Sequence, residues 1–240
     1  MKFVKLKSVD STNNWALEHF KELDDCTVVY ADSQTAARGR FERKWISGDC
    51  KNICATFILK PKNLDYLANF TQYMSLVILK VIQSYGVKGQ IKWPNDVLVD
   101  GKKLSGILCE AFREKNKTLG VVLGVGVNIN MPQEIIDEIS QPAVSLNLVL
   151  SKNIDRDEFL YKLVDEFFEH YDDIQKDGFS FIKQDYLDNI DFLNKQIFIR
   201  QKDGVEKIQY KALTIDDNGN LVVEDKNGIV STIYSGDLIL

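Results

Sequence analysis

The stretch QIKWPNDVLVDGKKLSGILCEAF, residues 90–112, decides how the chain folds. It predicts a strand, a turn at its Pro-Asn pair, a second strand, a tight hairpin at its Asp-Gly pair and a third strand. Successive side chains of a strand point to opposite faces, so Lys102 and Lys103 are expected on opposite faces of this third strand. One of the two lysines is therefore expected to point inward.

The segments on either side of this stretch alternate between strand and helix patterns. The helix expected at residues 10–23 begins with Ser11 or Thr12 as its N-cap, because a hydroxyl there satisfies free backbone amides. Strand patterns cover residues 2–7, 26–32, 52–59 and 118–130, and further helical patterns cover residues 64–85 and 156–189.

The character of the sequence changes near Asp191. Beyond it, apolar and polar residues alternate between Asp-Gly and Asn-Gly turns, which predicts five short strands in about fifty residues. Such a pattern is typical of a small β-barrel. We therefore expect a main domain over residues 1–190 and a small barrel over residues 191–240.

Composition narrows the function classes. The 240 residues carry a formal net charge of -5, which argues against general nucleic-acid binding. There is no apolar signal segment and no run long enough to span a membrane, so we expect a cytoplasmic protein with reduced thiols. His19 and His170 are the two histidines and both lie in helical patterns. A histidine zinc site or a Ser-His-Asp triad is therefore not expected.

A basic loop, QTAARGRFERKW at residues 34–45, stands out against this acidic balance. Composition alone gives roughly even odds that it is a solvated surface turn. The planar fork of arginine, however, suits carboxylates and phosphates, and Trp45 could stack on a flat ring such as adenine. The loop therefore predicts a site for a small anionic ligand.

Other polar positions fit the same kind of site. Asp96, close to Lys92, could hold Mg²⁺ against a triphosphate. Gly106 would let a ligand lie against the backbone, and Asn128 could pair with a purine edge or close a turn. The STNN segment, residues 11–14, is a helix cap or a polar wall at a helix N-terminus.

In order and combination, these motifs resemble the biotin protein ligase family. The resemblance spans Ser11 to Asn128, and the C-terminal strands resemble the SH3-like domain of that family. It implies an α+β fold, with a mixed β-sheet catalytic domain of the biotin/lipoate ligase type and a C-terminal SH3-like barrel. It also implies formation of biotinyl-5′-AMP from biotin and MgATP, followed by transfer to a lysine of a biotin carboxyl carrier domain.

The resemblance implies a role for each matching residue. Lys103, Arg40 and Asp96 are the expected catalytic residues, with Asp96 as a ligand of Mg²⁺. The residues expected to bind biotin are Ser11, Thr12, Asn13, Gln34, Arg38, Gly39, Arg40, Lys103 and Gly106, and those expected to bind the nucleotide are Arg38, Arg40, Trp45, Lys92, Asn95 and Asn128.

The chain also departs from the family pattern. Ala37 and Glu42 stand where glycines are common in the loop, which predicts a stiffer loop. Met1 lies ten residues before Ser11, so we expect a monofunctional ligase without a DNA-binding domain and without DNA as a partner. The resemblance leaves a homodimer possible.

Three other functions compete with this one. A lipoate or octanoate ligase or transferase would share the fold, and a transferase would need an active-site cysteine, for which Cys109 is the candidate. A non-enzymatic biotin sensor would not need the intact lysines and arginines. A single-strand nucleic-acid binder would need a basic face, which the barrel segment does not have in bulk.

Overall fold

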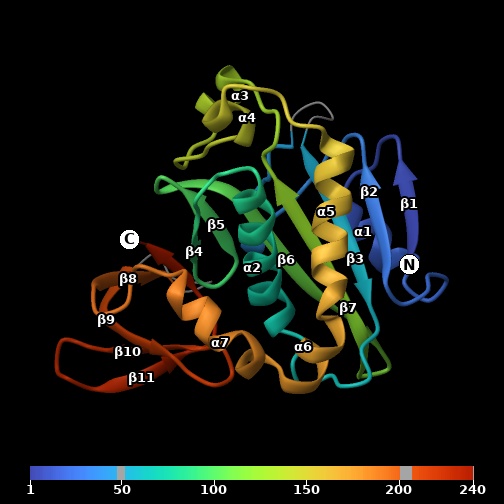
Figure 1. The fold of residues 1–240 in the computed structure, drawn as a ribbon. Coiled ribbons are helices and arrows are strands. Elements are labelled where there is room, and N and C mark those ends of the chain that lie inside the picture. The colour runs from blue at the N-terminus through green and yellow to red at the C-terminus, as the bar shows by residue number, and fades with distance from the viewer. Residues whose placement is uncertain (48–51, 201–206, 240) are drawn as a thin grey trace.

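The computed structural model describes residues 1–47, 52–200 and 207–239. Its main layer is a seven-stranded mixed sheet with the order β1-β2-β3-β7-β6-β5-β4 (Figure 1). β1 and β2 pair in parallel, and the other neighbouring strands pair antiparallel. The strands are β1 (Lys2–Leu6), β2 (Thr27–Ala31), β3 (Ile53–Leu59), β4 (Gln90–Lys92), β5 (Asp96–Val99), β6 (Lys102–Glu114) and β7 (Lys117–Val127).

The stretch at residues 90–112 forms β4, β5 and β6, as its pattern predicts. Asp96 pairs with Lys92 across the β4–β5 turn and with Gly106 on β6. Lys102 is exposed, whereas Lys103 is half-buried, so the two lysines do point to opposite faces. This stretch therefore brings the predicted lysine and aspartate to one face of the sheet.

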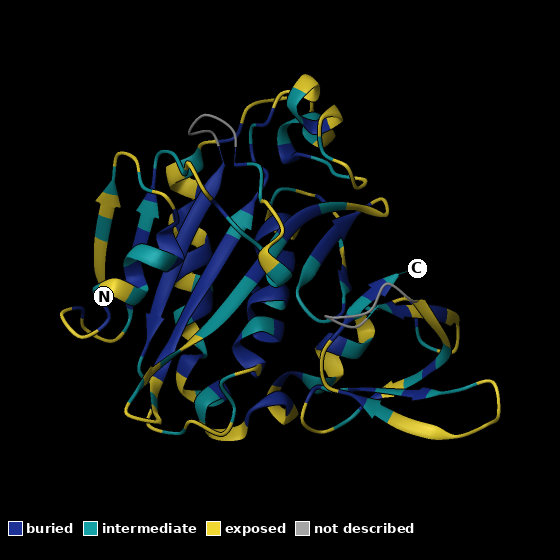
Figure 2. Cartoon of the chain, turned by 180° about the vertical axis from the view of Figure 1, so that it is seen from behind, coloured by how far each residue is buried: buried dark blue, intermediate teal, exposed yellow. Residues whose placement is uncertain are grey.

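Helices cover both faces of the sheet. α1 (Thr12–Glu18) packs on β2, β3 and β7 over a small apolar cluster that includes Ala16, Phe20 and Leu23. On the opposite face, α2 (Asn69–Ser84) and α5 (Arg156–Glu169) bury the larger core (Figures 1 and 2). The remaining helices are α3 (Gln133–Asp137), α4 (Leu146–Leu150), α6 (Tyr171–Asp177), α7 (Phe179–Asp188) and the 3-10 turn η1 (Arg40–Glu42).

Three helical predictions were wrong at their boundaries, and one of them is the helix expected at residues 10–23, since α1 ends at Glu18. α2 begins at Asn69 rather than at residue 64, because the Asn63 side chain accepts from the amide of Asp65 and holds the preceding chain in a turn. The pattern at residues 156–189 forms three helices rather than one. Gly178, with a φ of +57°, separates α6 from α7, since that conformation cannot continue a right-handed helix.

The C-terminal strands form a second, antiparallel sheet in the order β11-β10-β9-β8-β12, as expected for a small barrel. Its inward side chains join the core of the main sheet. The β9–β10 turn is tied to the main domain, because the carbonyl oxygen of Gly219 accepts from Gln72 at 2.6 Å and from the buried Trp93 indole at 3.0 Å. The strands are β8 (Gln196–Arg200), β9 (Lys207–Ile215), β10 (Leu221–Glu224), β11 (Val230–Ile233) and β12 (Asp237–Ile239).

The predicted α+β class is therefore confirmed, whereas the boundary near Asp191 stays a prediction. In the described part of the chain, no helix is both long and apolar enough to cross a membrane. Cys26 and Cys109 are free thiols, and Cys50 lies outside the described residues.

Candidate active site

A cavity of about 430 Å³ opens where the N-terminus of α1, the basic loop, the β4–β5 turn and the C-terminal sheet meet over β6 and β7. Eight of its lining residues are Arg or Lys and two are Asp, so the cavity favours an anion. The predicted site residues that line it are Ser11, Thr12, Asn13, Gln34, Arg38, Gly39, Arg40, Trp45, Lys92, Asn95, Asp96, Lys103 and Gly106.

One end of the cavity is built from uncharged groups at the start of α1. Ser11 is the N-cap and accepts from the amide of Asn14, as the sequence predicts. The Oε1 atom of Gln34 accepts two hydrogen bonds, from the Thr12 amide at 2.8 Å and from the Thr12 hydroxyl at 3.0 Å. Since Oε1 is occupied, the amide of Gln34 has only its N–H donors left to offer a ligand. We call this the head-group end, defined by Ser11, Thr12 and Gln34.

Asn13 holds this end against the sheet. Its Oδ1 atom accepts from the Thr56 hydroxyl at 2.7 Å, and its Nδ2 atom donates to the Leu108 carbonyl at 3.1 Å and to Glu110 at 2.9 Å. A Cβ atom on Gly124 would lie 2.2 Å from Oδ1 of Asn13, so only glycine fits there. Both Nδ2 hydrogens are used within the protein, and Asn13 supports the site rather than donating to a ligand.

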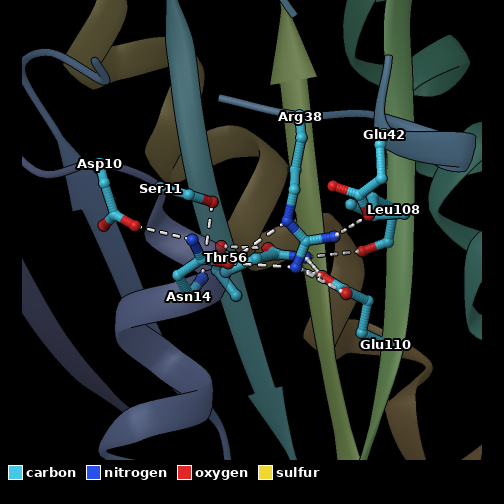
Figure 3. Close-up of polar contacts among 9 residues, drawn as sticks. Asp10, Ser11, Asn14, Arg38, Glu42, Thr56, Leu108 and Glu110 are labelled. Carbon is cyan, nitrogen blue, oxygen red and sulfur yellow. Dashed lines mark hydrogen bonds and ion pairs between the residues drawn. The ribbon is translucent and has the colours of Figure 1, made fainter. Parts of the chain in front are cut away.

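The guanidinium of Arg38 is also held by protein groups (Figure 3). Its Nη2 atom donates to the two carboxylate oxygens of Glu110 at 2.8 and 3.0 Å and to Oδ1 of Asn14 at 3.1 Å. Glu42 lies 3.6 Å away on the other side and is mostly exposed. The resemblance implies that Arg38 binds both biotin and the nucleotide, and in the structure its guanidinium lies beside the carboxylate of Glu110.

The opposite end of the cavity gathers cations. Lys103 Nζ lies 2.8 Å from Asp96, and Arg40 donates to Oδ1 of Asn95 at 3.0 Å. Arg40 also donates at 3.2 Å to the Gly236 carbonyl of the C-terminal sheet, and Asp237 on that sheet pairs with Arg40 and Arg43. We call this the anion end, defined by Arg40, Lys92, Lys103 and Asp96.

Burial shifts two of these cations. The pKa of Lys92 is lowered from its ordinary value, mainly because burial disfavours its charge, with the neighbouring Lys103 acting in the same direction. Burial likewise lowers the pKa of Arg40, against the opposing effects of Asp237 and Asp96. A bound anion would stabilise both charges, so the anion end is arranged to gain from binding one.

The basic loop is a compact turn. The Gly39 amide donates to the Arg43 carbonyl at 2.7 Å, and the Trp45 amide donates to the Ala37 carbonyl at 2.9 Å. Phe41 and Glu42 have φ values of +57° and +56°, a conformation that favours glycine. A glycine at position 42, as in the family pattern, would adopt this conformation with less strain than Glu42 does.

Trp45 is half-buried rather than fully exposed. Its indole lies against Gly126, where a Cβ atom would come within 2.7 Å of the ring, and beside Gly106 on the paired strand. Lys103 Nζ lies 5.6 Å from the ring centroid. The close approach predicted from these glycines is therefore made in part by Trp45 itself.

Asn128 does not line the cavity in the described structure. Its side chain donates to the Val144 carbonyl at 3.0 Å and its amide to the Leu104 carbonyl at 2.9 Å. It is buried and closes the turn after β7. The structure favours this turn over a contact with a purine edge.

Cys109 is also outside the cavity lining. Its thiol lies 3.7 Å from the Leu67 carbonyl, and burial raises its pKa to about 12. A thiol with such a pKa is protonated at neutral pH and is a poor nucleophile. The position does not suit the active-site cysteine of an acyl transferase.

Sequence reasoning missed several residues of the site. Glu110, and the C-terminal residues Asp237, Arg200 and Lys207, were not singled out, although the last three line the cavity. Strand alternation from Gly106 would have placed Glu110 on the face of that glycine, but nothing local links it to Arg38.

Comparison with known proteins identifies the family to which the chain belongs. The profile of the Biotin/lipoate A/B protein ligase family matches residues 5–128, just over half of the chain. The Bifunctional ligase/repressor BirA of Bacillus subtilis is 34% identical over 217 residues, covering 89% of this chain and 66% of that protein. The chain thus spans slightly less than two thirds of that relative.

Two further proteins are similar along most of their length. The biotin–acetyl-CoA-carboxylase ligase of Paracoccus denitrificans is 29% identical over 231 residues, which cover 93% of this chain and 94% of that protein. The structure of biotin protein ligase from Aquifex aeolicus in complex with biotin and ATP superposes with a TM-score of 0.82 and 28% identity, covering 99% of this chain and 97% of that one.

Proposed function

Because the chain belongs to the biotin/lipoate A/B protein ligase family, we propose that it is a biotin protein ligase. It activates biotin with MgATP to biotinyl-5′-AMP and transfers the biotinyl group to a lysine of a biotin carboxyl carrier domain. One observation carries the proposal: a single cavity joins an uncharged polar end to a cationic end. Biotin has a neutral ureido head and an anionic carboxylate, and ATP adds a second anion.

The head-group end receives the ureido group. The hydroxyls of Ser11 and Thr12 and the free N–H groups of Gln34 supply uncharged donors and acceptors. Tying Oε1 of Gln34 to Thr12 fixes the amide in one orientation before the ligand arrives, which lowers the entropy cost of binding.

The first step, formation of biotinyl-5′-AMP, takes place at the anion end. An oxygen of the biotin carboxylate attacks the α-phosphorus of ATP, the bond to the bridging oxygen breaks, and pyrophosphate leaves. Both partners are anions, so Lys103 and Arg40 offset their repulsion and stabilise the charge of the transition state. Lys92 adds a third cation beside them.

Asp96 orients the cations and then the acceptor. Its Oδ1 atom lies 2.8 Å from Lys103 Nζ, an ion pair that keeps the ammonium group at this end of the cavity. In the second step the amine of the carrier lysine attacks the carbonyl carbon of the anhydride, and AMP leaves with the bonding electrons. A carboxylate here can align that amine and take up its proton.

Magnesium enters with ATP, as part of the substrate complex. Among the described residues, no three or more His, Cys, Asp or Glu side chains form a group that could hold a metal ion. Mg²⁺ commonly takes one or two carboxylates together with phosphate oxygens. Asp96 fits the position of a single protein ligand to such an ion.

The basic loop protects the intermediate. A mixed anhydride is lost to water unless the site is covered until the carrier docks. Arg40 ties the loop to Asn95 and, through Gly236, to the C-terminal sheet. These contacts hold the loop over the cavity, which suits a cover that opens for the carrier.

The test is ATP-dependent transfer of labelled biotin to a biotin carboxyl carrier domain. We expect labelling that needs both ATP and Mg²⁺, and none on a carrier whose acceptor lysine is replaced by arginine. Lipoate and octanoate are offered in parallel. Preferred transfer of lipoate or octanoate would contradict the proposal, and biotin binding without ATP–pyrophosphate exchange would indicate a sensor.

A further inference from the structure

Glu110 on β6 is a half-buried carboxylate that the proposed reaction does not use. Both of its oxygens accept from Nη2 of Arg38, at 2.8 and 3.0 Å, and one also accepts from Nδ2 of Asn13 at 2.9 Å (Figure 3). The side chains of Arg38 and Glu110 are 21% and 23% exposed, so water screens the pair only partly. Glu110 therefore sits behind the head-group end and touches two residues that line it.

Without Glu110, Arg38 would lose its closest carboxylate partner. Its remaining partners would be Oδ1 of Asn14, at 3.1 and 3.3 Å, Glu42 at 3.6 Å, and the carboxylate of Asp10, which interacts with Arg38 by charge. The Glu42 side chain is 80% exposed, and an exposed ion pair contributes little. An arginine without a close carboxylate partner in the protein would bind the carboxylate of a ligand well.

Biotin and simple carboxylic acids could then bind in the wrong direction. The substrate has one anionic end, and the cavity has cations at both ends: Arg38 at one, Arg40 and Lys103 at the other. Productive binding requires that only the anion end attract the carboxylate. The Arg38–Glu110 pair meets this requirement, because it leaves the head-group end without net charge.

We propose that Glu110 is a positioning residue that sets specificity: it neutralises Arg38, so that the head-group end takes an uncharged cyclic urea and refuses a carboxylate. The inference rests on the proposed function. The hydrogen bond that Glu110 accepts from Asn13 has a second effect. It holds the Asn13 amide against Thr56 and keeps α1 in place over the sheet.

The experiment compares Glu110→Gln and Glu110→Asp with the wild type in biotin-dependent ATP–pyrophosphate exchange. Glu110→Gln keeps the shape and loses the charge, whereas Glu110→Asp keeps the charge and shortens the side chain. The probe is pentanoate, a carboxylate without the ring head, and pentanamide is its neutral counterpart. Glu114→Gln is the matched control, because Glu114 lies on the same strand and pairs with Lys21 on the surface.

For Glu110→Gln we expect the KM for biotin to rise about tenfold, because a charged group loses its partner, while the KM for ATP and kcat stay within about threefold. The inhibition constant of pentanoate is expected to fall about fivefold, and that of pentanamide to stay unchanged. Glu110→Asp keeps the wild-type inhibition constant for pentanoate. Glu114→Gln resembles the wild type in every measurement.

A purely structural role would raise the KM for biotin without making pentanoate a better inhibitor, and that result would overturn the inference. Equal effects of the Gln and Asp variants on pentanoate, or an unchanged KM for biotin, would overturn it as well. These failures concern Glu110 alone. If the wild type shows no biotin-dependent exchange, the proposed function fails, and the inference with it.

Discussion

The two ends of the cavity contain the same kinds of charged residue but differ in their charge balance. At the head-group end, Arg38 is paired closely with Glu110 and surrounded by hydroxyls and amides, so its charge is offset. At the anion end, the three cations Arg40, Lys92 and Lys103 face Asp96, and Arg43 and Asp237 lie beside them, so positive charge remains. The difference teaches that the number of cations near a site does not define its ligand. The ligand depends on which of those cations are paired with carboxylates of the protein.

The largest effect is expected from Lys103→Ala at the anion end. Adenylate formation should fall on the order of 10²–10³-fold, the usual loss when one preorganised charge that stabilises a transition state is removed. Biotin binding should survive in weakened form, because the head-group end is intact. Pyrophosphate exchange and calorimetric titration with biotin measure the two separately. The control is Lys102→Ala, whose side chain points to the other face; wild-type-like pyrophosphate release by Lys103→Ala would contradict the assignment.

Arg40→Gly should let the intermediate escape. The variant loses hydrogen bonds to Asn95, Ser235 and Gly236, each worth roughly 1 kcal/mol, so opening of the loop should become at least about tenfold more frequent. Leaked biotinyl-AMP is measured by trapping with a free amine. Arg113→Gly, which removes a charge far from the cavity, is the control. An unchanged yield of trapped product would show that the loop is not a cover.

Gly124→Ala tests the head-group end alone. The new methyl group would collide with Oδ1 of Asn13, so the KM for biotin should rise severalfold, about five- to tenfold, while the KM for ATP stays nearly constant. An Asn13→Ala background removes the collision, so Gly124→Ala should cost less there, and a double-mutant cycle gives the coupling. Additive effects of the two substitutions would show that Asn13 is not what the methyl group meets.

The smallest expected effect is a shift in the pH dependence of the affinity for ATP. Lys92 has a lowered pKa in the folded chain, so it loses its charge below its ordinary titration range. A lysine with a lowered folded-state pKa costs stability while protonated, and this cost is lost as the pH rises from that pKa to the ordinary pKa of the unfolded chain. Affinity for ATP should follow the charge and fall at alkaline pH. Lys92→Arg should retain ATP affinity further into the alkaline range, measured by titration from neutral to alkaline pH; identical pH profiles would rule out Lys92 as a contributor.

Much of the fold could be predicted, because strand and helix patterns are local. The strands around residues 90–112, the Ser11 cap and the five C-terminal strands lie where their patterns place them. The errors lie where a helix is interrupted, as at the turn around Asn63 and at the positive φ of Gly178. The signals for these interruptions are also local, but they are weaker than the helical pattern around them. Strand alternation was enough to predict that one of Lys102 and Lys103 points inward, and the family resemblance identified Lys103.

The partners of the cations could not be predicted in this way. Arg38 meets Glu110 across 72 positions of sequence, and Arg43 meets Asp237 across 194. Hydrophobic periodicity carries no information about contacts between residues so far apart in the sequence. In addition, an arginine can bind either the phosphate of a ligand or a carboxylate of the protein. The role of Asn128 was open for the same reason, since a turn and a purine contact use the same amide.

The amino-acid sequence by itself determined the elements, the family and the inventory of charges. The tertiary structure decided which of those charges are free. The physical reason is that secondary structure depends on neighbours within a few residues, whereas the effective charge of a side chain depends on burial and on whatever the fold places within a few ångströms of it.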